Sequence, residues 1–219
     1  MAPPPQTFAA KNVAELFPTL VWIFDLPPAD AAQANAAFLR QLDAIASPRP
    51  AQRNDLSLQS DHNLQAHACF APLQPKIDQA VRDIMAHLRL ADAAFMVTGA
   101  WLNLSVPGVR HHEHNHPNNF LSLVYYVRTP AGGDSIRFYD PRPQAHLVMP
   151  RSSGPSPHTA SSITFGVRAG RLVAFPAWLR HSVDANAGAG ERVSVAVNVM
   201  FRQFAERMAA PLWEAKLKA

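Results

Sequence analysis

The sequence predicts a mainly β protein with flanking helices, folded as a double-stranded β-helix barrel of the jelly-roll or cupin-like type. Two observations favour this fold class. Apolar residues follow a helical spacing in the first part of the chain, and from Phe95 onward they alternate with a period of two. The alternating part consists of many short strand-like runs separated by proline, glycine and polar residues.

The 219 residues are expected to form a single domain, because no internal repeat or second core is evident. Its four parts are expected to be a flexible arm at 1–17, a strand and helices that pack on the barrel at 18–92, the β-barrel core at 93–202 and a C-terminal helix at 203–219.

Two helices are predicted before the barrel. The first runs from Asp30 to Ile45, with Asp30 as N-cap and Ser47-Pro48 as the stop. The second runs from about Pro72 to Leu90, where apolar residues recur on one face. A strand at 20–24 precedes both helices, and residues 48–62 between them are expected to be a loop.

The barrel strands are predicted from period-two alternation. They are expected at 95–105, 120–127, 135–139, 163–167, 171–175, around His181 and at 192–201, followed by a helix at 204–216. Gly132-Gly133-Asp134 is expected to be a hairpin turn into the strand at 135–139. Residues 140–161 contain five prolines and are expected to be a long ordered loop or lid that selects the substrate.

Composition bears on the partners and the location of the protein. A net charge of +4 without a Lys/Arg cluster gives no reason to expect nucleic acid as a partner. The single cysteine, Cys69, excludes an intrachain disulfide and indicates a reducing, cytoplasmic location. No apolar run approaches the ~20 residues of a membrane span, and no secretory signal is seen at the N-terminus.

The richest stretch is Gly108–Pro117, which holds four of the ten histidines within six residues. On a strand, residues two apart share a face, so His112, His114 and His116 are expected on one face, opposite His111. Two imidazoles with this spacing can bind one metal ion, and a ligand from a distant strand can complete a facial set.

Two other interpretations of this stretch compete. The letters H-E-x-x-H match a zinc-peptidase pattern, but that chemistry needs a helix, and Pro107-Gly108 and Pro117 leave too few residues for one. The stretch can also be a solvated polar strand that binds metal only adventitiously.

Residues farther along the chain favour the metal site. His181 follows a strand and the tight corner Pro176-Ala177-Trp178, so it can enter the barrel from a new strand. Arg192 and Ser194 share a strand face, and a guanidinium beside a hydroxyl forms a socket for a carboxylate. A dicarboxylate keto acid could therefore bind iron at one end and this pair at the other.

These residues resemble a known family. The matching segments are His114-Asn115-His116-Pro117, Leu121 to Val127, Asp140-Pro141-Arg142, Phe175 to His181, Arg192-Val193-Ser194, residues 16–22 and the pair Trp101 and Asn103. Together they are similar to the 2-oxoglutarate/Fe(II) oxygenases of bacteria and phages with the pattern H-x-H-P, S-G-V-Y-Y-V, D-P-R, F-P-x-W-L-x-H and R-x-S. Leu123 stands where that pattern has glycine.

The resemblance implies an Fe(II)- and 2-oxoglutarate-dependent dioxygenase that hydroxylates a small-molecule or peptide substrate with dioxygen. Iron would be bound by His114, His116 and His181. The distal carboxylate of 2-oxoglutarate would be bound by Arg192 and Ser194.

Further pocket residues are expected around this centre. Tyr126, rather than Tyr125, and Asn103 are expected to help bind 2-oxoglutarate. His112, Trp178 and Asn198 are additional candidates, for which a packing or turn role is equally consistent with the sequence.

Some alternatives stay open at this point. Most such oxygenases carry a carboxylate ligand, so Glu113 or Asp140 could replace a strand histidine at the metal. A cupin-like three-histidine metalloenzyme that does not use 2-oxoglutarate, or a non-catalytic ligand-binding barrel, would share the same pattern. The sequence also leaves a homo-oligomer open.

Overall fold

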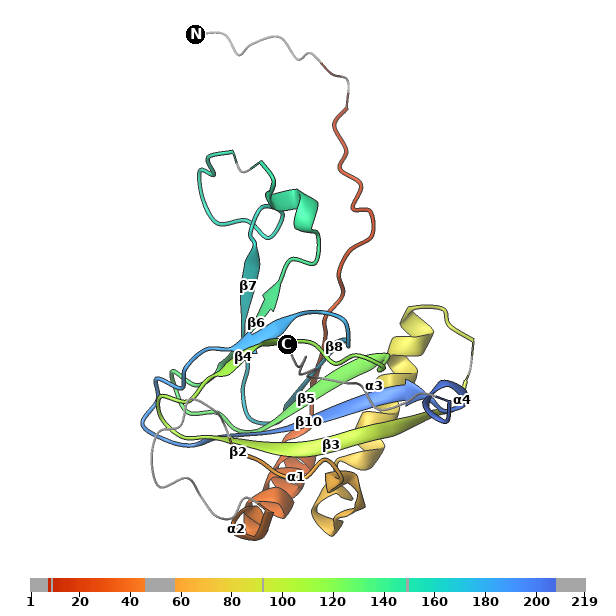
Figure 1. Cartoon of the computed structure of the whole chain (residues 1–219), viewed down its shortest axis with the longest axis vertical. Coiled ribbons are helices and arrows are strands. Elements are labelled where there is room, and N and C mark those ends of the chain that lie inside the picture. Colours follow the sequence, from red (N-terminus) through yellow and green to blue (C-terminus); the bar gives the residue numbers. More distant parts are fainter. Residues whose placement is uncertain (1–7, 9, 46–57, 92, 149, 208–219) are drawn as a thin grey trace, which may run out of the picture.

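The computed structural model describes residues 8, 10–45, 58–91, 93–148 and 150–207 (Figure 1). In this part of the chain the strands form two antiparallel sheets, the arrangement of a jelly roll. The predicted mainly β class with flanking helices is confirmed. No helix among these residues has the length and apolar character needed to cross a membrane.

The larger sheet has six strands. Their order across the sheet is β1 (Trp22–Asp25), β8 (Arg171–Pro176), β5 (Leu121–Arg128), β10 (Arg192–Phe201), β3 (Phe95–Ser105) and β2 (Leu58–Gln59). The smaller sheet has the order β4 (His111–His114), β9 (His181–Val183), β6 (Ser135–Tyr139) and β7 (Ser162–Gly166).

The two longest described helices, α1 (Pro28–Arg40) and α3 (Gln74–His87), have 13 and 14 residues. The others are α2 (Leu42–Ile45), α4 (Arg202–Ala205) and the 3-10 turns η1 (Leu64–Ala66), η2 (Ala68–Phe70) and η3 (Pro143–His146). α1 and α3 pack against the outer face of the larger sheet through one apolar cluster, which includes Phe38, Ile77 and Tyr125 (Figure 1). The hydroxyl of Tyr125 donates to Asn35 Oδ1 at 2.7 Å.

Alternation along the central strands decides which residues face away from these helices. On β10 the valines from Val193 to Val199 belong to the helix-side cluster, so Arg192 and Ser194 face the other way. On β5 the same alternation sends Tyr125 to the helices and Tyr126 to a second cluster between the sheets. The inner face of the larger sheet is therefore available for a site.

The first predicted helix differs from the structure at its start and in its continuity. It begins at Pro28, and Pro27 is the N-cap without a side-chain hydrogen bond, so the expectation that Asp30 caps the helix is wrong. Proline suits the first helical turn because its φ is already helical. Asp30 lies in that first turn and forms a salt bridge with Lys76. The helix ends at Arg40 and α2 follows as a separate turn.

The turn at 132–134 does not form a hairpin. β5 belongs to the larger sheet, whereas β6 pairs with β7 and β9 in the smaller one. The turn itself is tight, since Gly133 N–H donates to Pro130 O at 2.9 Å and Gly132 has a φ of 82°. Asp134 O then accepts from Val167 N–H at 2.8 Å, so the chain leaves the turn along the second sheet.

Other expectations are met in part. Within the predicted loop 48–62, Leu58–Gln59 pairs with β3 as β2. Among its described residues the loop 140–161 contains only η3, and it extends beyond the smaller sheet between β6 and β7 (Figure 1). Residues 8 and 10–17 form neither helix nor strand. Of the C-terminal helix predicted at 204–216, residues 204–207 are described; α4 ends at Ala205, and residues 206 and 207 form a turn. The helix stop at 47–48 and residues 1–7, 9 and 208–219 lie outside the described residues.

Candidate metal centre

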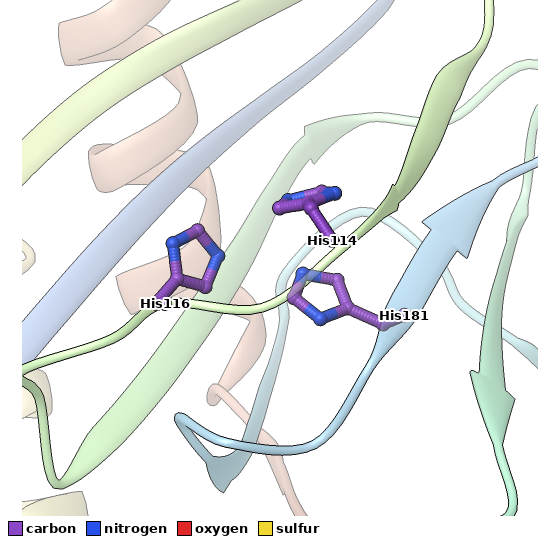
Figure 2. A group of neighbouring side chains, drawn as sticks. All are labelled: His114, His116 and His181. Carbon is purple, nitrogen blue, oxygen red and sulfur yellow. The ribbon is translucent and has the colours of Figure 1, made fainter. Parts of the chain in front are cut away.

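The three predicted metal ligands lie together at the start of the smaller sheet. His114 is the last residue of β4 and pairs directly with His181, the first residue of β9. His116 lies two residues beyond β4, where its backbone N–H donates to Ala177 O at 2.9 Å. Figure 2 shows the three rings turned toward one another. β4 is a strand, so the helical zinc-peptidase interpretation fails.

The distances suit a single metal ion. One nitrogen from each of the three histidines lies within 4.8 Å of the other two. The Nδ1 atom of His181 lies 3.0 Å from Leu179 O, and that of His114 lies 2.7 Å from His112 O. An Nδ1–H that donates to a backbone carbonyl leaves the Nε2 lone pair of the same ring for a metal.

Burial keeps the rings of His116 and His181 neutral. It lowers the pKa of His116 to about 3 and that of His181 to about 3, and the neighbouring His114 lowers both further. Metal ions bind neutral imidazole, so at neutral pH no proton has to leave these two residues before a metal enters. Two of the three histidines are therefore already in the neutral form that binds a metal cation.

Acidification is expected to destabilise the metal-free protein as the pH falls from about 6.5. The unfolded chain takes up protons at its histidines near pH 6.5, whereas folded His116 and His181 stay neutral down to about pH 3. The unfolded state then binds more protons, so the free energy of unfolding falls by up to ~1.4 kcal/mol per pH unit for each histidine.

Urea unfolding at pH 7 and pH 5 with a chelator present measures this loss. His181→Leu removes one of the pair His116 and His181. It is expected to make the dependence of stability on pH shallower. Equal stability at the two pH values would contradict the assignment of neutral, buried rings.

The predicted face assignment of the histidine stretch is wrong. His111, and not His112, lines the pocket together with His114 and His116, while His112 is exposed. The cause is a register shift between His111 and His114 in the pairing with β9, which inserts an extra residue and changes the alternation. Burial lowers the pKa of His111 to about 4.

Neither alternative carboxylate belongs to the histidine group. Glu113 pairs with Arg180 on the surface at 2.6 Å. Asp140 accepts two hydrogen bonds from the guanidinium of Arg142, both at 2.9 Å. The group that could hold a metal among the described residues is composed of histidines alone.

Glu113→Gln is expected to leave iron(II) affinity within about fivefold of wild type. The substitution removes only a partly exposed ion pair, which is worth ~0–1 kcal/mol. Anaerobic iron(II) titration of the variant measures this affinity. A loss as large as that caused by His114→Ala would instead assign the carboxylate to the metal.

A pocket opens beside the three histidines on the inner face of the larger sheet. It encloses about 410 Å³, open solvent at its mouth included. Its lining comes from both sheets and consists of Gln59, Trp101, Asn103, His111, His114, His116, Val124, Tyr126, Ile136, His181, Val183, Arg192, Ser194 and Ala196. The lining contains no Asp or Glu, so it favours an anionic ligand.

Arg192 is the main cation of this pocket. It is only 3% exposed, yet it forms no salt bridge with any Asp or Glu of the described chain. Its guanidinium carbon lies 5.3 Å from the ring centroid of Tyr126. A buried guanidinium without a counter-ion is costly, and an anionic ligand would offset that cost.

Several buried polar atoms of the pocket also lack hydrogen-bond partners within the described chain. These are Arg192 Nε, the hydroxyl of Tyr126 and Trp101 Nε1. Burial raises the pKa of the Tyr126 hydroxyl, and Arg192 partly opposes this effect. Since buried polar groups nearly always have partners, these atoms indicate a ligand site.

The remaining predicted residues separate into two groups. Ser194 and Asn103 line the pocket opposite each other on β10 and β3, and Gln59 donates to Asn103 Oδ1 at 2.9 Å. Asn198 is buried outside the lining, and Trp178 is 53% exposed.

Sequence reasoning missed His111 and Gln59 and gave no role to Trp101. Strand alternation two residues before Asn103 would have placed Trp101 on the pocket face.

The sequence of residues 99–198 matches the family described as "Putative 2OG-Fe(II) oxygenase", in which 2OG denotes 2-oxoglutarate. The matched range covers just under half of the chain and includes all three histidines of the group. No curated protein matches the chain.

Solved structures of such enzymes share the fold. The non-heme alpha-ketoglutarate-dependent epimerase SnoN from nogalamycin biosynthesis is 15% identical, with a TM-score of 0.60 over 84% of this chain and 77% of its own. A prolyl-4-hydroxylase from Pseudomonas putida is 20% identical, with a TM-score of 0.55 over 84% and 94%. HygX from Streptomyces hygroscopicus, solved with nickel and 2-oxoglutarate bound, is 12% identical, with a TM-score of 0.58 over 84% and 83%.

Proposed function

We propose that this chain, which carries the sequence of a 2OG-Fe(II) oxygenase over residues 99–198 and has the fold of such enzymes, hydroxylates a substrate with iron(II), 2-oxoglutarate and dioxygen. The observation that carries the proposal is the buried Arg192, without a salt bridge in the described chain, in the same pocket as the three clustered histidines. The histidines fit a divalent cation, and Arg192 fits a carboxylate. The finer resemblance, to the bacterial and phage enzymes with the H-x-H-P pattern, is part of the proposal.

The residues present fit iron(II). His114, His116 and His181 would bind it through one nitrogen each, and the carbonyls that fix His114 and His181 would keep those rings in place. When bound, iron(II) supplies the reduction of dioxygen that couples decarboxylation of 2-oxoglutarate, giving succinate and CO2, to oxidation of the substrate. Three protein ligands leave coordination positions for the co-substrate and dioxygen.

The larger sheet would hold the other end of 2-oxoglutarate. Ser194 pairs with Tyr126 across the strands, and the guanidinium of Arg192 lies beside Tyr126, so the three side chains surround one position. Arg192 would bind the distal carboxylate with two parallel hydrogen bonds, and the hydroxyls of Ser194 and Tyr126 would complete the set. Asn103 would contribute from the neighbouring strand.

Burial of this pocket would limit water and strengthen the binding of a carboxylate. Apolar side chains such as Val124, Ile136 and Ala196 share the lining with the polar groups and limit the entry of water. A low local dielectric strengthens the attraction between Arg192 and a carboxylate. No general acid or base is required of the protein, and the pocket contains no carboxylate pair to serve as one.

The proposal extends to the whole chain as one domain with a cytoplasmic location. The substrate would be a small molecule or a peptide, and the loop 140–161 beyond β6 and β7 would contact it. A cupin-like enzyme that does not use 2-oxoglutarate would have no need of a buried Arg192, which is why that alternative is not preferred.

Succinate formation tests the proposed function. The iron(II)-loaded protein is incubated with 2-oxoglutarate in air, and succinate and CO2 are quantified with and without candidate substrates. Slow succinate formation that stops when iron is chelated is the expected result. Complete absence of succinate, with iron and 2-oxoglutarate both bound, would contradict the proposal.

A further inference from the structure

Trp101 carries a buried hydrogen-bond donor with no described partner. The side chain is only 6% exposed, and its Nε1 atom is fully buried without an acceptor in the described part of the chain. Buried indole N–H groups usually have partners, and the indole can only donate. Trp101 lines the pocket beside the three histidines, so the missing acceptor can be part of a ligand.

Two observations describe the orientation of the ring. The His62 ring stacks on it with a centroid distance of 4.6 Å and an interplanar angle of 27°. A Cβ placed at Gly99 would lie 3.9 Å from Cζ3, so the six-membered ring is directed toward Gly99. The N–H edge is on the other side of the indole.

The register of the sheet places Trp101 near the metal end of the pocket. It pairs with Ala196 on β10, four residues along the strand from Arg192 and therefore about 13 Å away along the backbone. Its ring centroid is 5.6 Å from that of His116. The indole ring is thus beside the histidine group rather than beside the guanidinium.

Asn103 provides a second donor on the same strand face. Its Oδ1 accepts from Gln59 Nε2, which leaves its own Nδ2 hydrogens as the groups that it can offer to a ligand. The two donors lie two residues apart on β3 and face the same pocket. Asn103 pairs with Ser194 and so lies nearer the distal carboxylate, which leaves Trp101 as the β3 donor at the histidine end.

We infer that the indole N–H of Trp101 donates to the carboxylate next to the keto group of 2-oxoglutarate. The inference rests on the proposed function and adds a residue for the metal end of the co-substrate, while Arg192 serves the distal end. Trp101 then fixes how the keto acid lies against the metal. It also explains why an aromatic side chain with an N–H occupies this position.

Anaerobic binding to the iron(II)-loaded protein tests the assignment with two probes. The first is 2-oxoglutarate, and the second is 2-oxobutanoate, which has the same keto acid end without the distal carboxylate. Trp101→Phe keeps an aromatic ring and removes the N–H, so it is expected to weaken both probes by the same factor, on the order of 10-fold. Arg192→Met is expected to weaken only 2-oxoglutarate.

Trp22→Phe is the matched control, because Trp22 lies in β1 against His87, away from the pocket. It is expected to change neither affinity. Unchanged binding of both probes by Trp101→Phe would overturn the inference, whereas failure of the wild-type protein to bind 2-oxoglutarate would overturn the proposed function instead.

The indole resonances give a second readout that does not depend on the Trp101→Phe variant. In protein labelled with ¹⁵N at tryptophan and loaded with diamagnetic zinc(II), the N–H proton of Trp101 is expected to move downfield when 2-oxoglutarate is added. Replacing the other tryptophans one at a time with phenylalanine assigns the signal. A Trp101 resonance that does not move would overturn the inference, because a merely structural indole would give that result.

Discussion

His181→Ala is expected to abolish stoichiometric iron(II) binding. His181 is 4% exposed, and one of its nitrogens lies within 4.8 Å of a nitrogen in each of His114 and His116. Loss of an outer-shell partner typically costs a metal site 10–100-fold in affinity, so loss of one ligand of three is expected to exceed about 100-fold. Anaerobic dialysis against iron(II), followed by metal analysis, measures the change.

His112→Ala is the matched control for this experiment. His112 belongs to the same strand as His114 but is exposed and absent from the pocket lining. The variant is expected to retain iron at the wild-type ratio. Loss of iron in His112→Ala, with retention in His181→Ala, would contradict both the ligand set and the corrected face assignment.

Arg192→Met is expected to remove 2-oxoglutarate binding while leaving the metal-free fold as stable as wild type, or more stable. A buried cation without a described carboxylate partner costs stability, and methionine fills a similar volume without a charge. Truncating one partner of a buried charge pair typically costs 2–5 kcal/mol of binding free energy, or roughly 30-fold to several thousandfold in affinity.

Two measurements separate these effects. Thermal unfolding of the metal-free variant reports the stability of the fold, and isothermal titration with 2-oxoglutarate reports binding. Arg128→Met is the control, because Arg128 is partly exposed and pairs with Glu191 at 3.2 Å. Wild-type affinity for 2-oxoglutarate in Arg192→Met would exclude this residue from the carboxylate site.

The sequence predicts the fold well where a single physical rule decides the outcome. Period-two alternation gives the bounds of β3 correctly at Phe95–Ser105, and it places Arg192 and Ser194 on one face of β10. The same rule separates Tyr126 from Tyr125. These residues lie on regular strands, so a local pattern is sufficient.

The rule fails where pairing is irregular or crosses between sheets. The bulge between His111 and His114 exchanges the expected faces of His111 and His112, and only the pairing with β9 reveals it. The turn at 132–134 has hairpin chemistry, yet the following strand joins the other sheet through partners far away in sequence. Burial without a partner, as at Trp101, is likewise a property of the folded chain.

The measurement that tests the central claim most directly is anaerobic titration of the iron(II)-loaded protein with 2-oxoglutarate. The expected result is a weak metal-to-ligand charge-transfer band in the green region of the visible spectrum. The band saturates with one equivalent of 2-oxoglutarate and is lost in Arg192→Met. Iron binding without such a band would contradict the use of 2-oxoglutarate and leave a three-histidine metal centre of another class.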